Sequence, residues 1–587
     1  MKSLVPYLIP YRKDLTLGVL CLLLTNGFAL AIPWLLKEAI DHLKGPPAMS
    51  ALPRYALLLV ATAFLQGFFR FLARRQLVGT AREVEYELRN RLFWHLLQLP
   101  SSFFQRTKTG DLMARATQDV NTVRTLLGAG IMYSANILIV YTSTIALMAS
   151  IDPSLTLYAL LPSPLLFLAL THLKRRIRAR FQEVQEQFTS LSSKLQENLS
   201  GIRLVKAYAV EDQEVEAFDR LNQGYVEKNL ALARLEGLSQ PLAGAIGGFS
   251  VVIVLWAGGQ RVIGGSLTLG QLVAFNAYLT MLIWPTLAMA WIVSLREQGL
   301  VSMERIEALL NEEPSIQNGK GTAAPERIER GIEFRALRFA YRQGDGSLDG
   351  LALKDINLKI PQGAFVAIVG PTGSGKSTLV NLIPRLLEVE EGWLFIDGLD
   401  VTRIPLKTLR ENIGYVPQES FLFSDTIWEN IAFGLPRRQT PDARRQTQVE
   451  RAAEVADLVK DIETFPHGWE TVVGERGITL SSGQRQRVGL ARAVARDPQI
   501  LILDDALSNV DAETEERILK GLRETMAGRT TLITTHRLSA IKDADLIVVL
   551  HEGRVVEGGK HKELLSKGGL YATLWRKQQL QRELEMS

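Results

Sequence analysis

The first half of the chain alternates between long apolar stretches and charged stretches, whereas the second half has only short apolar runs. Leu15 to Leu36 contains no Asp, Glu, Lys or Arg, and at about 1.5 Å per residue such a helix crosses the roughly 30 Å hydrocarbon core of a bilayer. Five similar stretches follow, so the pattern predicts six membrane-spanning helices. The other five are about Tyr55–Ala73, Thr125–Ile151, Pro153–Leu173, Gly237–Gln260 and Val262–Leu295.

The loops between these stretches predict their orientation. Asp152 alone separates the third and fourth stretches, and Arg261 separates the fifth and sixth, which predicts two tight antiparallel pairs. Lys and Arg concentrate in the two long loops, after the second and the fourth stretch. Since cytoplasmic loops are enriched in these residues, we expect an integral, multi-pass protein of the plasma (bacterial inner) membrane. Both termini and the second half are then cytoplasmic.

Both long loops have the apolar spacing of helices, as at Leu88, Leu92 and Leu96. Polar residues interrupt each loop, at Thr107–Asp111 and at Val210–Gln213. Each interruption is either a solvated turn or a short crosswise segment that contacts another domain.

The second half predicts an α/β domain. Residues 311–330 lack periodicity and are interpreted as a linker. Short apolar runs and helical stretches then alternate, as in α/β folds. The predicted domains are 1–310 (transmembrane, with long cytoplasmic extensions), 311–330 (linker), 331–573 (α/β domain) and 574–587 (helical tail).

Composition changes this interpretation little. The mean hydropathy of +0.07 averages the two unlike halves. The single cysteine excludes an internal disulfide. The net charge of +5 is explained by Lys and Arg beside the apolar stretches, so no nucleic-acid partner is expected.

A glycine-rich run lies between an apolar strand, Phe365–Val369, and a predicted helix. In such a P-loop, backbone N–H groups surround a phosphate, the lysine meets the β- and γ-phosphates and the following hydroxyl binds Mg²⁺. The run therefore predicts binding of ATP and Mg²⁺. Its residues are Gly370, Pro371, Thr372, Gly373, Ser374, Gly375, Lys376, Ser377 and Thr378.

A second motif agrees with the first. The apolar strand Ile500–Leu503 ends in Asp504, and a carboxylate in that position holds Mg²⁺ opposite a P-loop.

With these motifs, nearly the whole chain resembles exporter-type ATP-binding cassette (ABC) transporters, as a half-transporter. The resemblance implies a six-span membrane domain of the type I exporter fold, followed by an α/β P-loop nucleotide-binding domain. It rests on further matches in the family's order. These are Tyr341, Gln418, the signature Leu480, Ser481, Ser482, Gly483 and Gln484, the D-loop Ser508–Asp511, His536, and the loop Gly474–Gly477.

The resemblance assigns a role to each match. Asp505, His536 and Gln418 are implied to be catalytic, with Gln418 also at the Mg²⁺ beside Ser377 and Asp504. Tyr341 is implied to stack on adenine. The signature and Asp511 are implied to complete the ATP site of the opposite subunit, so a dimer is required. The remaining matches are implied to couple the domains: Gly110 and Asp111, Glu211 and Asp212, and Glu475 in the exporter-specific loop.

One residue departs from the family pattern. The position after Asp504 is usually Glu, and here it is Asp505. Its carboxylate reaches about 1 Å less far, and a misplacement of that size costs on the order of 10²-fold in rate. We therefore expect this chain's own site to bind ATP well and hydrolyse it slowly, as in the degenerate half of heterodimeric multidrug-type exporters. The alternatives are a homodimeric drug or lipid flippase with slow sites, and an ATP-gated channel or regulatory protein.

A second, milder departure lies in the signature. Ser482 stands where Gly is more usual, and it leaves Ser481 and Gly483 in place.

The spans indicate the substrate only in outline. They contain neutral polar and aromatic residues, which suit a cavity for amphipathic drugs or lipids or, equally, helix packing and interfacial anchoring. These residues are Asn26, Gln66, Asn136, Tyr141, Asn276, Trp284 and Trp291.

Overall fold

The computed structural model describes residues 4–43, 48–317, 331–342, 348–435, 442–474 and 480–586. The chain divides into two compact units. One consists of Met1–Leu96 with Gly110–Asn311, and the other of Leu97–Thr109 with Glu312–Ser587. Most of the predicted linker lies outside the described residues, which end at Gln317 and resume at Gly331.

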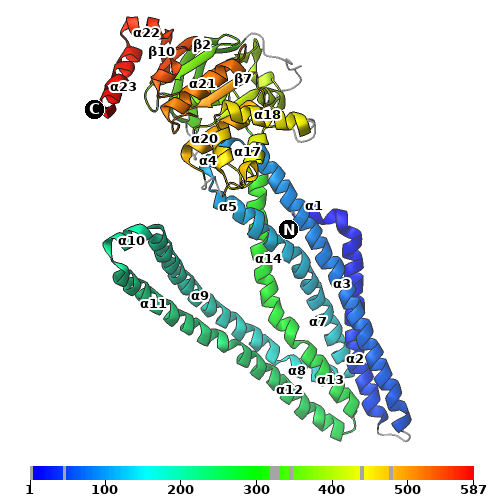
Figure 1. Ribbon diagram of the computed structural model, residues 1–587. Coiled ribbons are helices and arrows are strands. Elements are labelled where there is room, and N and C mark those ends of the chain that lie inside the picture. Colours follow the sequence, from blue (N-terminus) through cyan, green and yellow to red (C-terminus); the bar gives the residue numbers. More distant parts are fainter. Residues whose placement is uncertain are drawn as a thin grey trace. The chain divides into compact units, whose positions relative to one another are not determined.

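The first unit consists of helices (Figure 1). Residues Thr109 to Ile151 are helical throughout, with two π-helical stretches, η2 and η3. In chain order the elements are α1 (Val5–Leu8), η1 (Ile9–Tyr11), α2 (Arg12–His42), α3 (Ala48–Gln98), α5 (Thr109–Ala114), η2 (Arg115–Asp119), α6 (Val120–Thr125), η3 (Leu126–Gly130), α7 (Ile131–Ile151), α8 (Pro153–Leu160), α9 (Pro162–Ser200), α10 (Ile202–Tyr208), α11 (Glu211–Gly237), α12 (Ser239–Ile263), α13 (Leu269–Met281) and α14 (Ile283–Leu310).

The first three predicted spans are helical throughout, and the fourth and fifth are helical apart from one residue each, Leu161 and Leu238. The fourth is divided at Leu161 between α8 and α9, although Leu161 keeps helical dihedral angles. The helical hydrogen bonds are interrupted there because Pro162 has no N–H to donate to the preceding turn. The sixth, predicted as Val262–Leu295, is wrong at its start, because 264–268 form a turn and the helix begins at Leu269; it is also divided at Leu282.

Among the residues that the structure describes, four helical stretches are long and apolar enough to cross a membrane: Val5–His42, Leu52–Gln98, Thr109–Ile151 and Leu269–Leu310. The fifth predicted span, Gly237–Gln260, overlaps a shorter apolar helical stretch, Gly247–Ile263.

Charged side chains at the ends of the spans are paired with other spans. Arg261, predicted to separate the fifth and sixth spans, lies instead in the last turn of α12, and it contacts the carboxylate of Asp152 between α7 and α8. Asp41, in the last turn of α2, accepts hydrogen bonds from the Thr268 hydroxyl at 2.6 Å and from the Gly270 N–H at 2.9 Å. The desolvation of these charges is thereby offset by hydrogen bonds.

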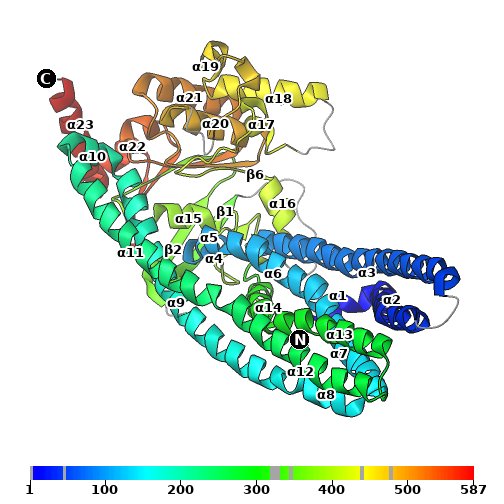
Figure 2. The same ribbon diagram turned by 90° about the horizontal axis from the view of Figure 1, so that it is seen from below.

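The second long loop is a helical hairpin. Helices α9 and α11 run side by side in both views (Figures 1 and 2), with α10 between them. An ion pair, Lys194–Glu214 at 2.5 Å, joins the two helices, and Lys228 donates to the Gln187 side chain at 2.9 Å.

The second unit contains two β-sheets. A six-stranded sheet has the order β10-β9-β3-β8-β7-β6, in which only β10 is antiparallel to its neighbour, and a four-stranded sheet has the order β2-β1-β4-β5. The two strands predicted by range, Phe365–Val369 and Ile500–Leu503, are present as β3 and β7, which also includes Asp504. The strands are β1 (Ile332–Arg342), β2 (Leu348–Ile360), β3 (Phe365–Val369), β4 (Leu394–Ile396), β5 (Leu399–Asp400), β6 (Ile413–Val416), β7 (Ile500–Asp504), β8 (Thr530–Thr534), β9 (Leu546–His551) and β10 (Arg554–Gly559).

Helices cover both faces of the larger sheet. Figure 2 shows α18, α20 and α21 on one side and α15 and α16 on the other. Strand β3 is buried on both faces, because Ala367 and Val369 pack into one core and Val366 and Ile368 into the other. The main helices of this unit are α4 (Ser101–Arg106), α15 (Lys376–Leu382), α16 (Leu406–Glu411), α17 (Ile427–Ala432), α18 (Asp442–Val455), α19 (Val459–Thr464), α20 (Ser482–Ala495), α21 (Ala512–Thr525), α22 (His561–Lys567) and α23 (Leu570–Met586).

A segment that the predicted boundaries assign to the transmembrane part belongs to this second unit. It is Leu97–Thr109, which contains the short helix α4. The Ser101 hydroxyl donates to the carbonyl of Leu386 at 2.7 Å, and Arg106 forms an ion pair with Glu312. The polar interruption of the first long loop therefore follows a short helix that packs with the α/β unit.

Candidate nucleotide-binding and hydrolysis site

The P-loop connects the end of β3 to the start of α15, the order that the sequence predicts. Gly370 has φ +151°, and a Cβ there would lie 2.0 Å from the carbonyl oxygen of Leu550. No other residue fits at that position. The Nζ of Lys376, whose side chain is buried, donates to the carbonyls of Gly370 and Pro371 at 3.0 and 2.9 Å. Burial lowers the pKa of the Lys376 ammonium, and the charges of Asp505 and Asp504 oppose this shift.

The residues of this loop fit a phosphate group. The Ser374 hydroxyl is buried and, within the described part of the chain, its oxygen has no hydrogen-bond partner. A Cβ at Gly373, where φ is +80°, would meet no atom within 4 Å, so one side of the loop is open. Phosphate oxygens accept from such a hydroxyl and from the successive N–H groups of a P-loop.

Oxygen ligands suited to Mg²⁺ come from the first turn of α15, which follows the P-loop, and from the ends of strands β7 and β8. The hydroxyls of Ser377 and Thr534 both donate to Oδ1 of the buried Asp504, at 2.9 and 2.7 Å. Mg²⁺ is usually held by one or two protein oxygens together with phosphates and water, and Ser377 and Asp504 supply that set. Gln418, predicted to join them, is exposed two residues after β6.

Asp505 follows directly in the left-handed backbone region, with φ +47°. Its N–H donates to both oxygens of Thr534, the carbonyl at 3.1 Å and the hydroxyl at 2.9 Å. His536 lies two residues after Thr534. Desolvation and the charge of Lys376 lower the pKa of the His536 imidazole, and Asp505 opposes this shift. The structure thus brings the P-loop lysine and two predicted catalytic residues within electrostatic reach of each other.

Tyr341 lies near the end of β1 and close to the P-loop helix. Its hydroxyl is 2.9 Å from the Thr378 Oγ1, and its ring meets Phe339 edge to face at 5.1 Å between centroids. The residue is 37% exposed, which leaves surface for the predicted adenine contact.

The signature begins helix α20 with reciprocal capping. The Ser481 hydroxyl accepts from the Gln484 N–H at 3.2 Å, while the Gln484 side chain accepts from the Ser481 N–H at 3.0 Å. Leu480 is buried. The Ser482 hydroxyl accepts from Arg485 at 3.0 Å within the same helix, so this departure from glycine is accommodated locally.

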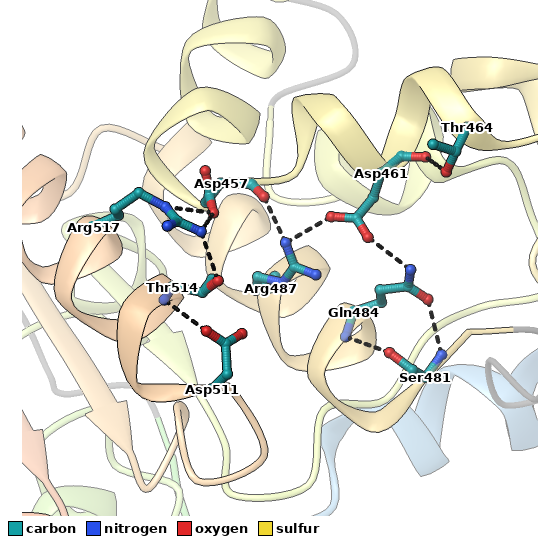
Figure 3. A network of polar contacts seen from close by, with 9 residues as sticks. All are labelled: Asp457, Asp461, Thr464, Ser481, Gln484, Arg487, Asp511, Thr514 and Arg517. Atoms are coloured by element: carbon teal, nitrogen blue, oxygen red, sulfur yellow. Dashed lines mark hydrogen bonds and ion pairs between the residues drawn. The ribbon is translucent and has the colours of Figure 1, made fainter.

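A polar network joins the signature helix to the D-loop helix (Figure 3). Asp461 accepts from Gln484 at 2.8 Å and from Arg487 at 2.7 Å. Arg487 also donates to the carbonyl of Asp457, whose carboxylate binds Arg517 of α21. The two elements predicted to serve the opposite subunit's site are therefore held together within one chain.

The D-loop residues themselves lie against the signature helix. Asp511 caps α21 by accepting from the Thr514 N–H at 2.9 Å, and this hydrogen bond lowers the pKa of its carboxyl. A Cβ at Gly483 would lie 2.8 Å from the carbonyl oxygen of Asn509, so a larger residue would separate the signature from the D-loop.

Comparisons with known proteins agree with this geometry. The family described as ABC transporter transmembrane region matches residues 15–286, and the family described as ABC transporter matches residues 353–508. The "probable multidrug resistance ABC transporter ATP-binding/permease protein YheI" of Bacillus subtilis (strain 168) is 36% identical over 97% of this chain and 96% of its own length. The chain belongs to the ABC transporter family.

Other members are similar over almost the whole chain. The "ATP-dependent lipid A-core flippase" of Desulfotalea psychrophila is 34% identical over 98% of this chain and 99% of its own. The structure of a bacterial Atm1-family ABC exporter with ATP bound matches with a TM-score of 0.77 and 28% identity, over 97% of this chain and 99% of that one. This ABC transporter thus has the type I exporter fold, a helical transmembrane region followed by an α/β nucleotide-binding domain. It is an integral membrane protein whose ATPase domain drives transport, and exporters of this kind act as dimers.

The residues predicted to couple the two domains of the ABC transporter occupy helix starts. Gly110 and Asp111 lie in the first turn of α5. Glu211 and Asp212 lie in the first turn of α11, directly after the short helix α10. Glu475 lies outside the described residues. Their coupling role remains a prediction.

Sequence reasoning did not find several side chains that hold these motifs in place. Thr534 was the easiest of them to predict. It ends a buried strand that runs parallel to the Asp504 strand, so its side chain is expected at the same edge of the sheet. The others lie on helices or in turns, where a polar residue usually faces solvent. They are Asp457, Asp461, Gln486, Arg487, Arg517 and Arg537.

The P-loop assignment predicts the effect of removing its lysine. K376A is expected to weaken ATP binding to this chain about tenfold to a hundredfold, since a charge-assisted contact to phosphate is lost. Photolabelling of this chain with azido-ATP at increasing concentrations measures the effect. K359A is the matched control, because Lys359 is exposed on β2. Equal labelling of K376A and K359A would contradict the assignment.

Proposed function

We propose that this chain is one half of a dimeric, heterodimeric ABC exporter that moves hydrophobic or amphipathic compounds, drugs or lipids, out across the plasma (bacterial inner) membrane. The charge distribution of the loops supports a cytoplasmic position for both termini and for the nucleotide-binding domain. The names of the relatives, a multidrug resistance transporter and a lipid A-core flippase, support the substrate class.

The observation that carries the heterodimer proposal is the way Asp505 is held. Its N–H is fixed by both oxygens of Thr534, and its neighbours Asp504 and Ala506 are buried. The backbone therefore cannot advance to compensate for the methylene that Asp lacks relative to Glu. The carboxylate stays about 1 Å short of the position that a Glu reaches, which slows attack on ATP by on the order of 10²-fold.

This chain's own site then binds ATP and Mg²⁺ without rapid turnover. Gly370 to Thr378 surround the phosphates, Ser377 and Asp504 hold the metal ion, and Asp505 and His536 face the reacting end. A bound Mg²⁺ neutralises charge that develops on the phosphate oxygens. An exporter that cycles at a useful rate needs a second site with a longer carboxylate, which a different half-transporter supplies.

The elements that this chain contributes to its partner are intact. Ser481 and Gln484 cap the signature helix reciprocally, and the Ser482 hydroxyl accepts a hydrogen bond from Arg485. The partner's catalytic site, completed by these residues, is proposed to carry most of the hydrolysis.

Aromatic packing in the transmembrane helices supports an amphipathic substrate. Tyr133 of α7 lies between Trp284 and Trp291 of α14, with ring centroids 5.4 and 5.7 Å apart. Both tryptophans are about half exposed. Aromatic rings offer flat apolar surface that accepts varied hydrophobic groups.

Restoring the longer carboxylate tests the role of Asp505. D505E is expected to raise ATP turnover of the purified protein about tenfold to a hundredfold, because the carboxylate regains its reach. D497E is the matched control, since Asp497 also has a left-handed backbone, φ +56°, and lies outside the site. Unchanged turnover in D505E would show that reach does not limit this site.

Co-purification tests the need for a different partner. The chain purified alone is expected to hydrolyse ATP slowly. Its complex with a second ABC half-transporter that carries Glu at the equivalent position is expected to be at least about tenfold faster. Changing that Glu to Gln in the partner should remove the gain. Robust turnover by this chain alone would support the homodimer instead.

A further inference from the structure

The C-terminal helix α23 contacts the loop that carries His536. This loop connects β8 to the short helix η7 (Leu538–Ile541). The side-chain amide of Gln578 accepts from the Leu538 N–H at 2.8 Å and donates to the His536 carbonyl at 2.7 Å. One side chain thus fixes the backbone on both sides of Arg537.

Helix α23 is itself anchored in the nucleotide-binding domain. Tyr571, Trp575 and Gln578 are spaced i, i+4 and i+7, which places them on one face of the helix. Tyr571 is fully buried and Trp575 packs against the same core. The carboxylate of Glu557 accepts from backbone N–H groups at the start of the helix. Gln578 is therefore held at a fixed place along this face.

The opposite side of the loop is held by Arg537. Its guanidinium donates to the carbonyls of Val510 and Ser508 in the D-loop, at 2.6 and 2.8 Å, and pairs with Glu515 at 2.9 Å. Between these two attachments the His536 side chain remains exposed, on a backbone that cannot shift without breaking hydrogen bonds.

We propose that Gln578 is a positioning residue for ATP hydrolysis, which holds the backbone of His536 so that the imidazole meets the reacting phosphate. The C-terminal helix is then part of the hydrolytic machinery. The inference rests on the catalytic role proposed for His536. No bond to the nucleotide is required of Gln578, since it acts through the loop.

The neighbouring glutamine on the same helix supplies a matched control. Gln579 is exposed, so Q578A and Q579A remove the same side chain in two environments. Turnover of the full-length protein is measured in both the wild-type and the D505E background, because D505E is expected to make this chain's own site faster. Q578A is expected to lower kcat about tenfold and to change KM for ATP less than about twofold, and Q579A to leave both unchanged. Q578E, which keeps only the acceptor for the Leu538 N–H, is the milder variant and is also expected to lower kcat.

A double variant separates the inference from the proposed function. In the H536A background, with residual turnover measured at high enzyme concentration, Q578A is expected to have no further effect. If Q578A matches Q579A, or lowers turnover as much without His536 as with it, the positioning role is wrong. If H536A alone leaves turnover unchanged in both the wild-type and the D505E background, His536 is not catalytic. The positioning role of Gln578, which acts through His536, is then also wrong.

Discussion

A single carboxylate oxygen, Oδ1 of Asp504, organises the nucleotide site. It accepts hydrogen bonds from the hydroxyls of Ser377 and Thr534. These bonds connect the segment after β3 with the ends of β8 and β7. A buried carboxylate without such partners would be strongly destabilising. The parallel order β3-β8-β7 is what allows the three side chains to meet, because the carboxyl ends of adjacent parallel strands lie at one edge of the sheet.

The same interaction determines what Asp505 can do. Thr534, which donates to Asp504, also accepts from the N–H of Asp505. The backbone of Asp505 is therefore fixed. How far its carboxylate extends toward the nucleotide depends only on the length of the side chain. This geometry supports our proposal that a substitution which leaves charge and basicity nearly unchanged slows hydrolysis strongly. Beyond the site, Arg537 connects the His536 loop to the D-loop, and Gln486 connects the D-loop to the signature helix. The chain's own site and its contribution to the partner's site thus share one set of hydrogen bonds.

The sequence was sufficient for strands β3 and β7, the P-loop and the strand-end carboxylate, because each depends on local pattern and on the order of elements. The predicted run Phe365–Val369 is strand β3 residue for residue. The attachment of Leu97–Thr109 to the α/β unit was not predictable in the same way, since Ser101 and Leu386 are brought together by the fold and by no local signal. The bonds of Gln578 and Asp461 escaped prediction for the same reason. The fourth span was predicted as one helix, whereas its hydrogen bonds are interrupted before Pro162, and the sixth was predicted to start at Val262, whereas it starts at Leu269 after a glycine-containing turn. Hydropathy alone overlooks both, because they depend on the backbone properties of proline and glycine.

We propose that this chain's own site hydrolyses ATP so slowly that it retains the nucleotide through many turnovers of the dimer. The most direct measurement photolabels the Mg²⁺-loaded, transport-competent dimer with azido-ATP carrying its radiolabel on either the α- or the γ-phosphate, and compares the two labels recovered on this chain after several turnovers. The account predicts equal recovery of both labels on this chain, because the γ-phosphate stays in place while the dimer continues to hydrolyse ATP. Loss of the γ-label at the rate of ATP turnover, with the α-label retained, would contradict it.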